Sequence, residues 1–219
     1  MKIISLNVSM ARTVQYKGQD VATGIYKSAV SGPRMVRRLN IDGDEQADLK
    51  LHGGEHKAVY AFPSEHYSFY EKALNKGPYE PGQFGENLTT EGMLEPEVRI
   101  GNRYRVGEVR LEVSQPRFPG YKFGLRMEAA EATMIYIKSM KTGFYLRVLN
   151  EGEIQAGDVI KLEFENVRAP TVEAVHKLYY FGKNNIPAMR HAAQCESLGR
   201  EFRDEFENRI HDLEAKVRQ

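Results

Sequence analysis

The feature that most constrains the fold is a change of hydrophobic periodicity near Pro170. Before this proline, short segments alternate apolar and polar residues and are separated by glycine-rich turns, which is typical of β-strands. After it, apolar residues recur every three or four positions, which is typical of amphipathic helices. We therefore predict a mostly β domain over residues 1–168, with a few short helices, and a three-helix domain over residues 169–219.

Several β segments can be predicted in detail. In the last one, Ile160, Leu162 and Phe164 alternate with charged residues, which is typical of a strand. Residues 106–109 read Val-Gly-Glu-Val, which indicates a two-residue hairpin turn of type II′ with glycine at its first central position. Gly18 marks a second turn between two early strands.

Two further helices are expected within the β domain. Residues 64–74 predict a short helix with Ser64 as its N-cap and His66 on the surface. Residues 128–140 also predict a helix. Its expected apolar stripe consists of Ala130, Met134, Ile137 and Met140.

The C-terminal helical segment divides into three pieces, with breaks at residues 182–185 and 197–199. We place Cys195 in the middle helix, as a buried structural thiol. The last helix carries an apolar stripe that needs a partner surface, either the other two helices or a second subunit. We expect these helices to help form a homodimer. The stripe consists of Phe202, Phe206, Ile210, Leu213 and Val217.

Composition excludes several classes of protein. The formal net charge is +1, so that bulk electrostatic binding to a nucleic-acid polymer is not expected. No stretch approaches the roughly 20 apolar residues that span a bilayer, so no membrane contact is expected. The chain has one cysteine, which excludes an intramolecular disulfide, and its start lacks a cleavage signal. These features favour a cytoplasmic protein.

A strand ending in a proline-stiffened loop is the candidate binding element. Residues 111–113 alternate as a strand does, and Pro116 and Pro119 then end the strand because neither has an amide hydrogen to donate. Arg117 and Lys122 place two positive charges on this loop, which suits an anionic ligand. From these residues alone, an ordinary surface loop remains the alternative.

Two sequence patterns resemble metal-binding motifs but lack features that those metal sites need. His52 and His56 are four residues apart, as zinc ligands on one helix face would be, but glycines at positions 53 and 54 disfavour a helix there. The acidic run over residues 42–48 lacks the glycine and the distal glutamate of a calcium loop. We therefore predict no metal ligands from the protein itself.

The loop over residues 114–122, Ser-Gln-Pro-Arg-Phe-Pro-Gly-Tyr-Lys, resembles the signature of the MOSC family, named after the C-terminal domain of molybdenum-cofactor sulfurase. The YiiM-type branch of this family is the most similar. Three other segments, over residues 23–28, 43–60 and 84–92, resemble further family motifs in the same order. The resemblance implies a closed or nearly closed β-barrel, with the three-helix segment as its appendage.

The resemblance also implies a chemistry. Family members bind a molybdopterin cofactor, and the YiiM-type branch is associated with reductive removal of N-hydroxyl groups from compounds such as N-hydroxylated purines. The substrate would be a small molecule, and the electrons would come from a separate reductase. A pyridoxal-phosphate association also attaches to the family, but no lysine here has an identifiable Schiff-base setting.

Residue by residue, the resemblance assigns a cofactor pocket. Its basic members suit a pterin phosphate, which carries close to two negative charges. His52 is the candidate proton donor because its unperturbed pKa lies near 6.5, and a hydrogen-bonded structural role for it stays equally open. The expected cofactor-binding residues are Lys27, Ser28, Asn87, Gln115, Arg117, Lys122 and Arg147.

One position departs from the family pattern. The residue after the second proline of the loop is normally a cysteine, a soft ligand suited to molybdenum, and here it is Gly120. Three explanations stay open: a divergent member, a variant sequence, or a protein that binds the cofactor without using it. The alternative function is therefore a non-catalytic module that binds a pterin or phosphate, or carries the cofactor.

Overall fold

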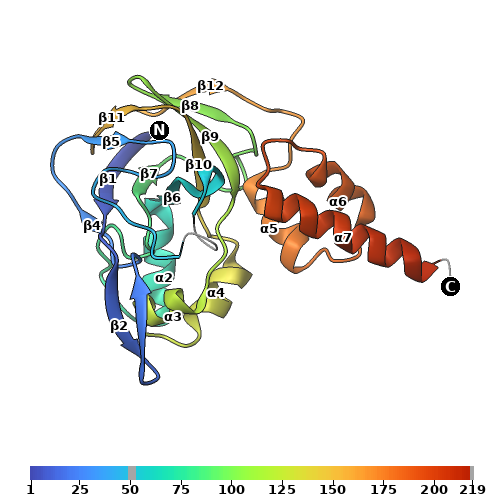
Figure 1. The fold of residues 1–219 in the computed structure, drawn as a ribbon, viewed down its shortest axis with the longest axis horizontal. Helices are drawn as coiled ribbons and strands as arrows, with labels where there is room; N and C mark the ends of the chain where they lie inside the picture. The colour runs from blue at the N-terminus through green and yellow to red at the C-terminus, as the bar shows by residue number, and fades with distance from the viewer. Residues whose placement is uncertain (49–52, 218–219) are drawn as a thin grey trace.

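The computed structural model describes residues 1–48 and 53–217, and its largest element is a curled mixed sheet of eight strands (Figure 1). The strand order is β12-β8-β9-β10-β6-β7-β1-β4, and β6 with β7 is the one parallel pair in it. The sheet curls into a half-barrel, which confirms the predicted fold class. Its strands are β1 (Lys2–Val8), β4 (Ser28–Ala29), β6 (Val59–Pro63), β7 (Leu88–Glu91), β8 (Arg103–Val106), β9 (Val109–Pro116), β10 (Phe144–Asn150) and β12 (Lys161–Phe164).

Two small antiparallel sheets flank the large one. β2 (Arg12–Tyr16) pairs with β3 (Gln19–Thr23), and β5 (Arg34–Val36) pairs with β11 (Gly152–Ile154). The turn between β2 and β3 consists of Lys17 and Gly18, both with positive φ, as a type I′ turn requires. The predicted turn at Gly107 is also confirmed, since its φ is +57° and the flanking valines pair.

The last predicted strand is present as β12, and both of its faces are exposed. Leu162 is 44% exposed and Phe164 is 48% exposed. The physical reason is that β12 is an edge strand, hydrogen-bonded to β8 alone. Phe164 finds a partner in the guanidinium of Arg103, which lies 5.3 Å from its ring centre.

Short helices cover one end of the sheet around an aromatic core. The helices are η1 (Glu55–Lys57), η2 (Ser64–His66), α2 (Tyr67–Leu74), α3 (Tyr121–Met127) and α4 (Ala132–Ser139). Figure 1 shows α2, α3 and α4 gathered below the strands. The largest members of this core have no exposed surface, and they are Phe62, Tyr70, Phe84, Phe123 and Tyr136.

Two predictions about the helix over residues 64–74 were wrong. Ser64 makes no cap hydrogen bond, because the segment opens as a 3-10 turn that runs into α2. His66 is only 4% exposed, and its Nε2 lies 2.6 Å from the carboxylate of Glu95. A carboxylate from a distant loop therefore pairs with this histidine, and local sequence does not show that partner.

The predicted helix over residues 128–140 begins later and buries a different face. Glu128 has a positive φ and ends α3. The sequence analysis had treated the first residues of α3 as loop. Within α4, Tyr136 is buried whereas Met134 is 52% exposed. The expected stripe is wrong because the tyrosine ring joins the aromatic core, while its hydroxyl donates to the carbonyl of Thr142.

The C-terminal segment forms the three predicted helices, α5 (Val172–Tyr180), α6 (Ile186–Ala193) and α7 (Arg200–Val217), with breaks where expected. The side chain of Thr171 caps α5, and that of Asn185 caps α6. Cys195 follows α6 instead of lying within it. The expected division between residues 168 and 169 falls just before α5 and stays a prediction.

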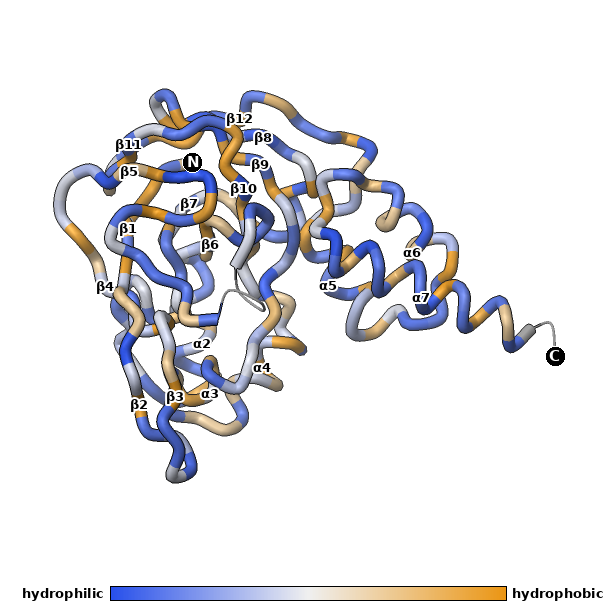
Figure 2. The backbone as a smooth tube through the Cα atoms, viewed as in Figure 1, coloured by the Kyte–Doolittle hydropathy of each residue, from blue (hydrophilic) through white to orange (hydrophobic). Residues whose placement is uncertain are grey.

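Four positions of the apolar stripe of α7 pack within the chain itself, and the side chain of Val217 lies outside the described part of the structure. Phe202 and Phe206 have no exposed surface, Ile210 is 8% exposed, and Leu213 packs against the same core. Figure 2 shows the alternation of hydrophobic and hydrophilic residues along α7. The stripe therefore does not require a second subunit, and the homodimer stays a prediction. No helix in the described ranges is long and apolar enough to cross a membrane.

Replacing Phe206 by alanine tests how firmly the helices pack. We expect Phe206→Ala to lower the free energy of unfolding by about 3–5 kcal/mol, since it leaves a cavity in a closed core. Phe181→Ala is the matched control, because Phe181 is 54% exposed, and it should change stability by less than about 0.5 kcal/mol. Denaturant unfolding measures both, and equal effects would contradict the buried stripe.

Candidate functional site

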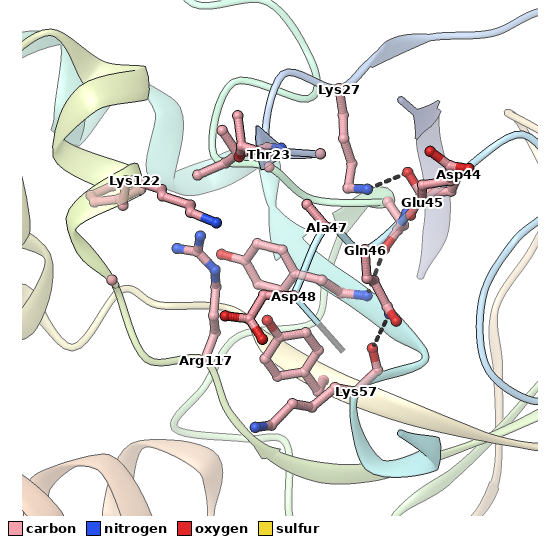
Figure 3. Close-up of a pocket in the computed structure, with 18 residues that line it drawn as sticks. Thr23, Lys27, Asp44, Glu45, Gln46, Ala47, Asp48, Lys57, Arg117 and Lys122 are labelled. Carbon is pink, nitrogen blue, oxygen red and sulfur yellow. Dashed lines mark hydrogen bonds and ion pairs between the residues drawn. The ribbon is translucent and has the colours of Figure 1, made fainter. Parts of the chain in front are cut away.

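A pocket opens where the loop after β9 faces the loops that follow β3 and β5 (Figure 3). It holds about 650 Å³ of free space, part of it open to solvent. Its lining includes seven charged side chains, which are Lys27, Asp44, Glu45, Asp48, Lys57, Arg117 and Lys122.

Arg117 is the most unusual group in the pocket wall. It is 6% exposed, and its guanidinium carbon lies 4.9 Å from the ring centre of Tyr60, 5.2 Å from that of Phe123 and 5.6 Å from that of Tyr136. Its buried Nη1 has no hydrogen-bond partner in the described part of the chain. A guanidinium is always charged, and a buried charge is costly without a partner. The geometry therefore suits an anionic ligand at Arg117.

Lys27 and Asp44 form a buried ion pair on the opposite wall. Burial lowers the pKa of Lys27, and the carboxylate of Asp44 offsets part of this effect. Asp44 also accepts hydrogen bonds from the backbone amide of Ser9 and from the side chain of Asn87. Because Asp44 is held from several sides, Lys27 is held in place at the pocket.

Asn87 lines the pocket, but its amide is engaged by the protein. Its Oδ1 accepts from the backbone amide of Tyr60 at 3.1 Å. Its Nδ2 donates to Asp44 at 2.9 Å and to the carbonyl of Asn7 at 3.4 Å. Both amide hydrogens are therefore used, and the arrangement favours the loop-bracing role for Asn87.

Glu86 is a structural residue that the sequence analysis missed. It has no exposed surface, and its carboxylate accepts from the backbone amides of Gly82 and Phe84 and from the hydroxyls of Tyr67 and Thr89. Burial raises the pKa of this carboxyl. These bonds fix the loop that presents Asn87. The available sequence signal was the position of Glu86 next to Asn87 in the same family motif.

The loop continues through Gly120 into α3, where Lys122 lies. The Nζ of Lys122 donates to the carbonyl of Ala22 at 2.8 Å, which ties α3 to the β2–β3 hairpin. Gly120 precedes α3 with φ −85° and ψ 175°, a conformation open to any residue. A Cβ built on Gly120 would meet nothing within 4 Å. The backbone therefore does not require glycine at this position.

The other predicted site residues lie elsewhere. Gln115 lines an adjoining cavity instead of the main pocket. Ser28 is exposed on β4 and is not part of the lining. Arg147 lies on β10, where its Nη2 is 2.5 Å from the carboxylate of Glu112. His52 lies outside the described residues, and its role as proton donor stays a prediction.

Many of the lining residues that the sequence analysis did not assign to the pocket lie in the family motif over residues 43–60. Lys57 and Tyr60 follow the Gly-Gly pair of the family motif, so their position in that motif was the available signal. Tyr145 on β10 completes the wall and carried no signal beyond its strand. Within residues 1–48 and 53–217, no group of three or more histidine, cysteine or acidic side chains could hold a metal ion.

The sequence of this chain matches two family models. Residues 48–161 match the MOSC domain, and residues 170–212 match the YiiM-like, 3-alpha helix domain. The chain belongs to the MOSC family. A solved structure of YiiM from Geobacillus stearothermophilus superposes with a TM-score of 0.82 at 32% identity, covering 95% of this chain and 98% of that one.

Two relatives extend the comparison of this MOSC protein. YflK of Bacillus subtilis (strain 168) is 35% identical over 204 residues, which are 93% of this chain and 92% of YflK. A protein of Gibberella moniliformis (strain M3125 / FGSC 7600) named "Reductase" is 36% identical over 148 residues. That match covers 66% of this chain and 26% of the reductase.

Replacing Arg117 tests whether the pocket binds anions. We expect Arg117→Met to weaken binding of inorganic pyrophosphate by about tenfold or more, because it removes charge-assisted hydrogen bonds. Its melting temperature should stay the same or rise, since an apolar chain replaces a buried charge whose Nη1 has no hydrogen-bond partner in the described chain.

The matched control is Arg110→Met, because Arg110 lies on β9, is 55% exposed and pairs with Glu163 on the surface. It should bind pyrophosphate as the parent does in isothermal titration. Equal binding by the parent and Arg117→Met would rule out Arg117 as the anion site.

Proposed function

We propose that this MOSC protein is a molybdenum-cofactor-binding reductase that removes the N-hydroxyl group from N-hydroxylated compounds such as purine bases. In the reaction R–NHOH + 2e⁻ + 2H⁺ → R–NH₂ + H₂O, the N–O bond breaks and its oxygen leaves as water. The nitrogen is reduced, and the two electrons come from a separate reductase protein. When bound, the cofactor supplies the two-electron chemistry.

The observation that carries the proposal is the buried guanidinium of Arg117, whose Nη1 has no hydrogen-bond partner in the described chain, in a pocket that also presents Lys27 and Lys122. These three cations fit the phosphate of a pterin cofactor, because multiple charged donors are what a phosphate dianion binds best. The rings around Arg117 keep water from one side of the guanidinium, which strengthens its attraction for an anion.

The residues of this chain divide into binding and positioning roles. Arg117, Lys27 and Lys122 would hold the phosphate. Asp44 and Asn87 would keep Lys27 in place through their hydrogen bonds. The position of Gly120 supplies no side-chain ligand, so the metal would be held by the sulfurs of the cofactor alone. The name of the Gibberella moniliformis relative supports a reductive reaction.

A non-catalytic binding module is the second candidate, and Gly120 is the observation that favours it. A glycine with open space around it provides no thiolate at the position where the family carries cysteine. Such a module would hold the cofactor or another phosphorylated ligand without turnover. Pyridoxal phosphate is a weaker fit, because Lys27, the buried lysine opposite Arg117, is engaged with Asp44.

Gly120→Cys decides how much the missing thiol matters. We expect the parent, purified from a cofactor-producing host, to contain molybdenum, and the variant to retain several-fold more of it. The neighbouring Arg117 and Lys122 should favour the thiolate, and nothing near the new Cβ blocks it. Metal analysis and reduction of an N-hydroxylated adenine with a chemical electron donor provide the measurements.

Gly120→Ala is the control, because it adds the Cβ without a thiol and should match the parent. Turnover in the cysteine variant alone would assign the parent to the binding-module class. Equal turnover in all three would show that the thiol is dispensable. If no preparation exceeds about a tenth of an equivalent of molybdenum, the reductase proposal fails.

A further inference from the structure

Two arginines lie on one tyrosine ring outside the lining of the anion pocket. The guanidinium carbon of Arg12 is 3.9 Å from the ring centre of Tyr26, and that of Arg126 is 5.0 Å from the same centre. Because both distances end at one ring, the two positive charges lie within about 9 Å of each other and repel. Neither guanidinium forms an ion pair with a carboxylate in the described part of the chain.

The two arginines belong to different elements that meet beside the pocket. Arg12 opens β2 and lies directly opposite Thr23 of β3, which lines the pocket. Arg126 lies in the last turn of α3. Figure 1 shows the β2–β3 hairpin beside α3, where the rings of Tyr16 and Tyr121 stack with their centres 5.3 Å apart. The two charges therefore face each other across the contact between the hairpin and α3.

Arg126 carries a buried donor that the protein does not satisfy. The residue is half-buried, and its Nε has no hydrogen-bond partner among residues 1–48 and 53–217. Burial lowers the pKa of this guanidinium, which shows that its charge is poorly solvated. A buried N–H without an acceptor is costly, and a buried charge without a counter-ion adds to that cost. The environment of Arg126 thus favours an external anion.

The carboxylates near Arg126 are engaged elsewhere. Glu86 has no exposed surface, and its oxygens accept the four hydrogen bonds that fix the loop before Asn87. The side chain of Glu128 is 84% exposed, and its carboxylate lies 3.8 Å from the Nζ of Lys76. Neither acid neutralises the arginine pair, so the positive charge at the contact is left for a ligand.

We propose that Arg12 and Arg126 form a second anion site, which takes a phosphate group, either as a free ion or as part of an ester. Each guanidinium presents several N–H donors in a rigid plane, a geometry that matches the oxygens of a phosphate. The bound anion offsets the repulsion between the two arginines. Because these residues come from the hairpin and from α3, the anion also clamps the hairpin onto α3, as the bond from Lys122 to Ala22 does nearby.

Inorganic phosphate is the probe, and Arg117→Met is the background because it disables the anion pocket. In isothermal titration of the full-length chain at constant ionic strength, we expect Arg117→Met to bind phosphate. Adding Arg126→Met or Arg12→Met should weaken this binding by about tenfold or more, since each removes charge-assisted hydrogen bonds. Adding Arg110→Met is the matched control, because it removes the same charge from a surface pair with Glu163 and should leave the affinity unchanged.

Glycerol 3-phosphate in the same titration separates the two sources of the group. Tighter binding of glycerol 3-phosphate than of phosphate would assign the site to an ester, and weaker binding would assign it to the free ion.

Trypsin cleavage after Lys17, in the exposed turn of the hairpin, tests the clamp. Phosphate should slow this cut several-fold in Arg117→Met and should not slow it once Arg126→Met is added, with mass spectrometry identifying the cut. Thermal unfolding without phosphate shows whether each variant is folded. If Arg126→Met does not fold, Arg12→Met decides the question, because Arg12 is exposed.

Two results would overturn the second anion site. One is that Arg117→Met binds neither phosphate nor glycerol 3-phosphate. The other is that the additions of Arg126→Met, Arg12→Met and Arg110→Met all leave the affinity equal. Phosphate binding that needs both arginines but does not slow cleavage after Lys17 would refute the clamp.

Discussion

The burial of a positive charge among aromatic rings is the constraint on which the site depends. The guanidinium of Arg117 contacts three aromatic rings, and its Nη1 has no hydrogen-bond partner in the described chain. The next residue, Phe118, points to the other domain and packs among Tyr179, Tyr180 and Phe202. Two neighbouring side chains thus anchor the loop to both parts of the molecule.

The helical domain therefore has a clear structural role in the site. The backbone amide of Gly199 donates to the carbonyl of Ser114 at the end of β9, and Glu201 pairs with Lys57 beside the pocket and its adjoining cavity. Because Phe202 and Phe206 of α7 are buried against the rest of the chain, the start of this helix is held firmly. A barrel without these helices would lack one wall of the adjoining cavity.

Much of this arrangement was predictable because it depends on residues that are close together in the sequence. The change of periodicity at Pro170, the turns at Gly18 and Gly107 and the proline-stiffened strand end all appear in the structure as expected. What could not be predicted depends on distant partners. Glu95 pairs with His66 in the interior, and Tyr136 of α4 packs in a core whose other members come from β6, α2, α3, β10 and the loop at Phe84. Arg147 was assigned to the pocket by resemblance, yet a buried carboxylate on the neighbouring strand holds it.

The central claim that we propose is that the loop after β9 holds the cofactor phosphate at Arg117 and places the cofactor metal beside Gly120. Crystals of the chain purified from a cofactor-producing host, measured at the molybdenum absorption edge, test this directly. The account predicts one anomalous-scattering peak beside Gly120, with the cofactor phosphate at Arg117. A molybdenum peak at any other place on the protein would contradict it.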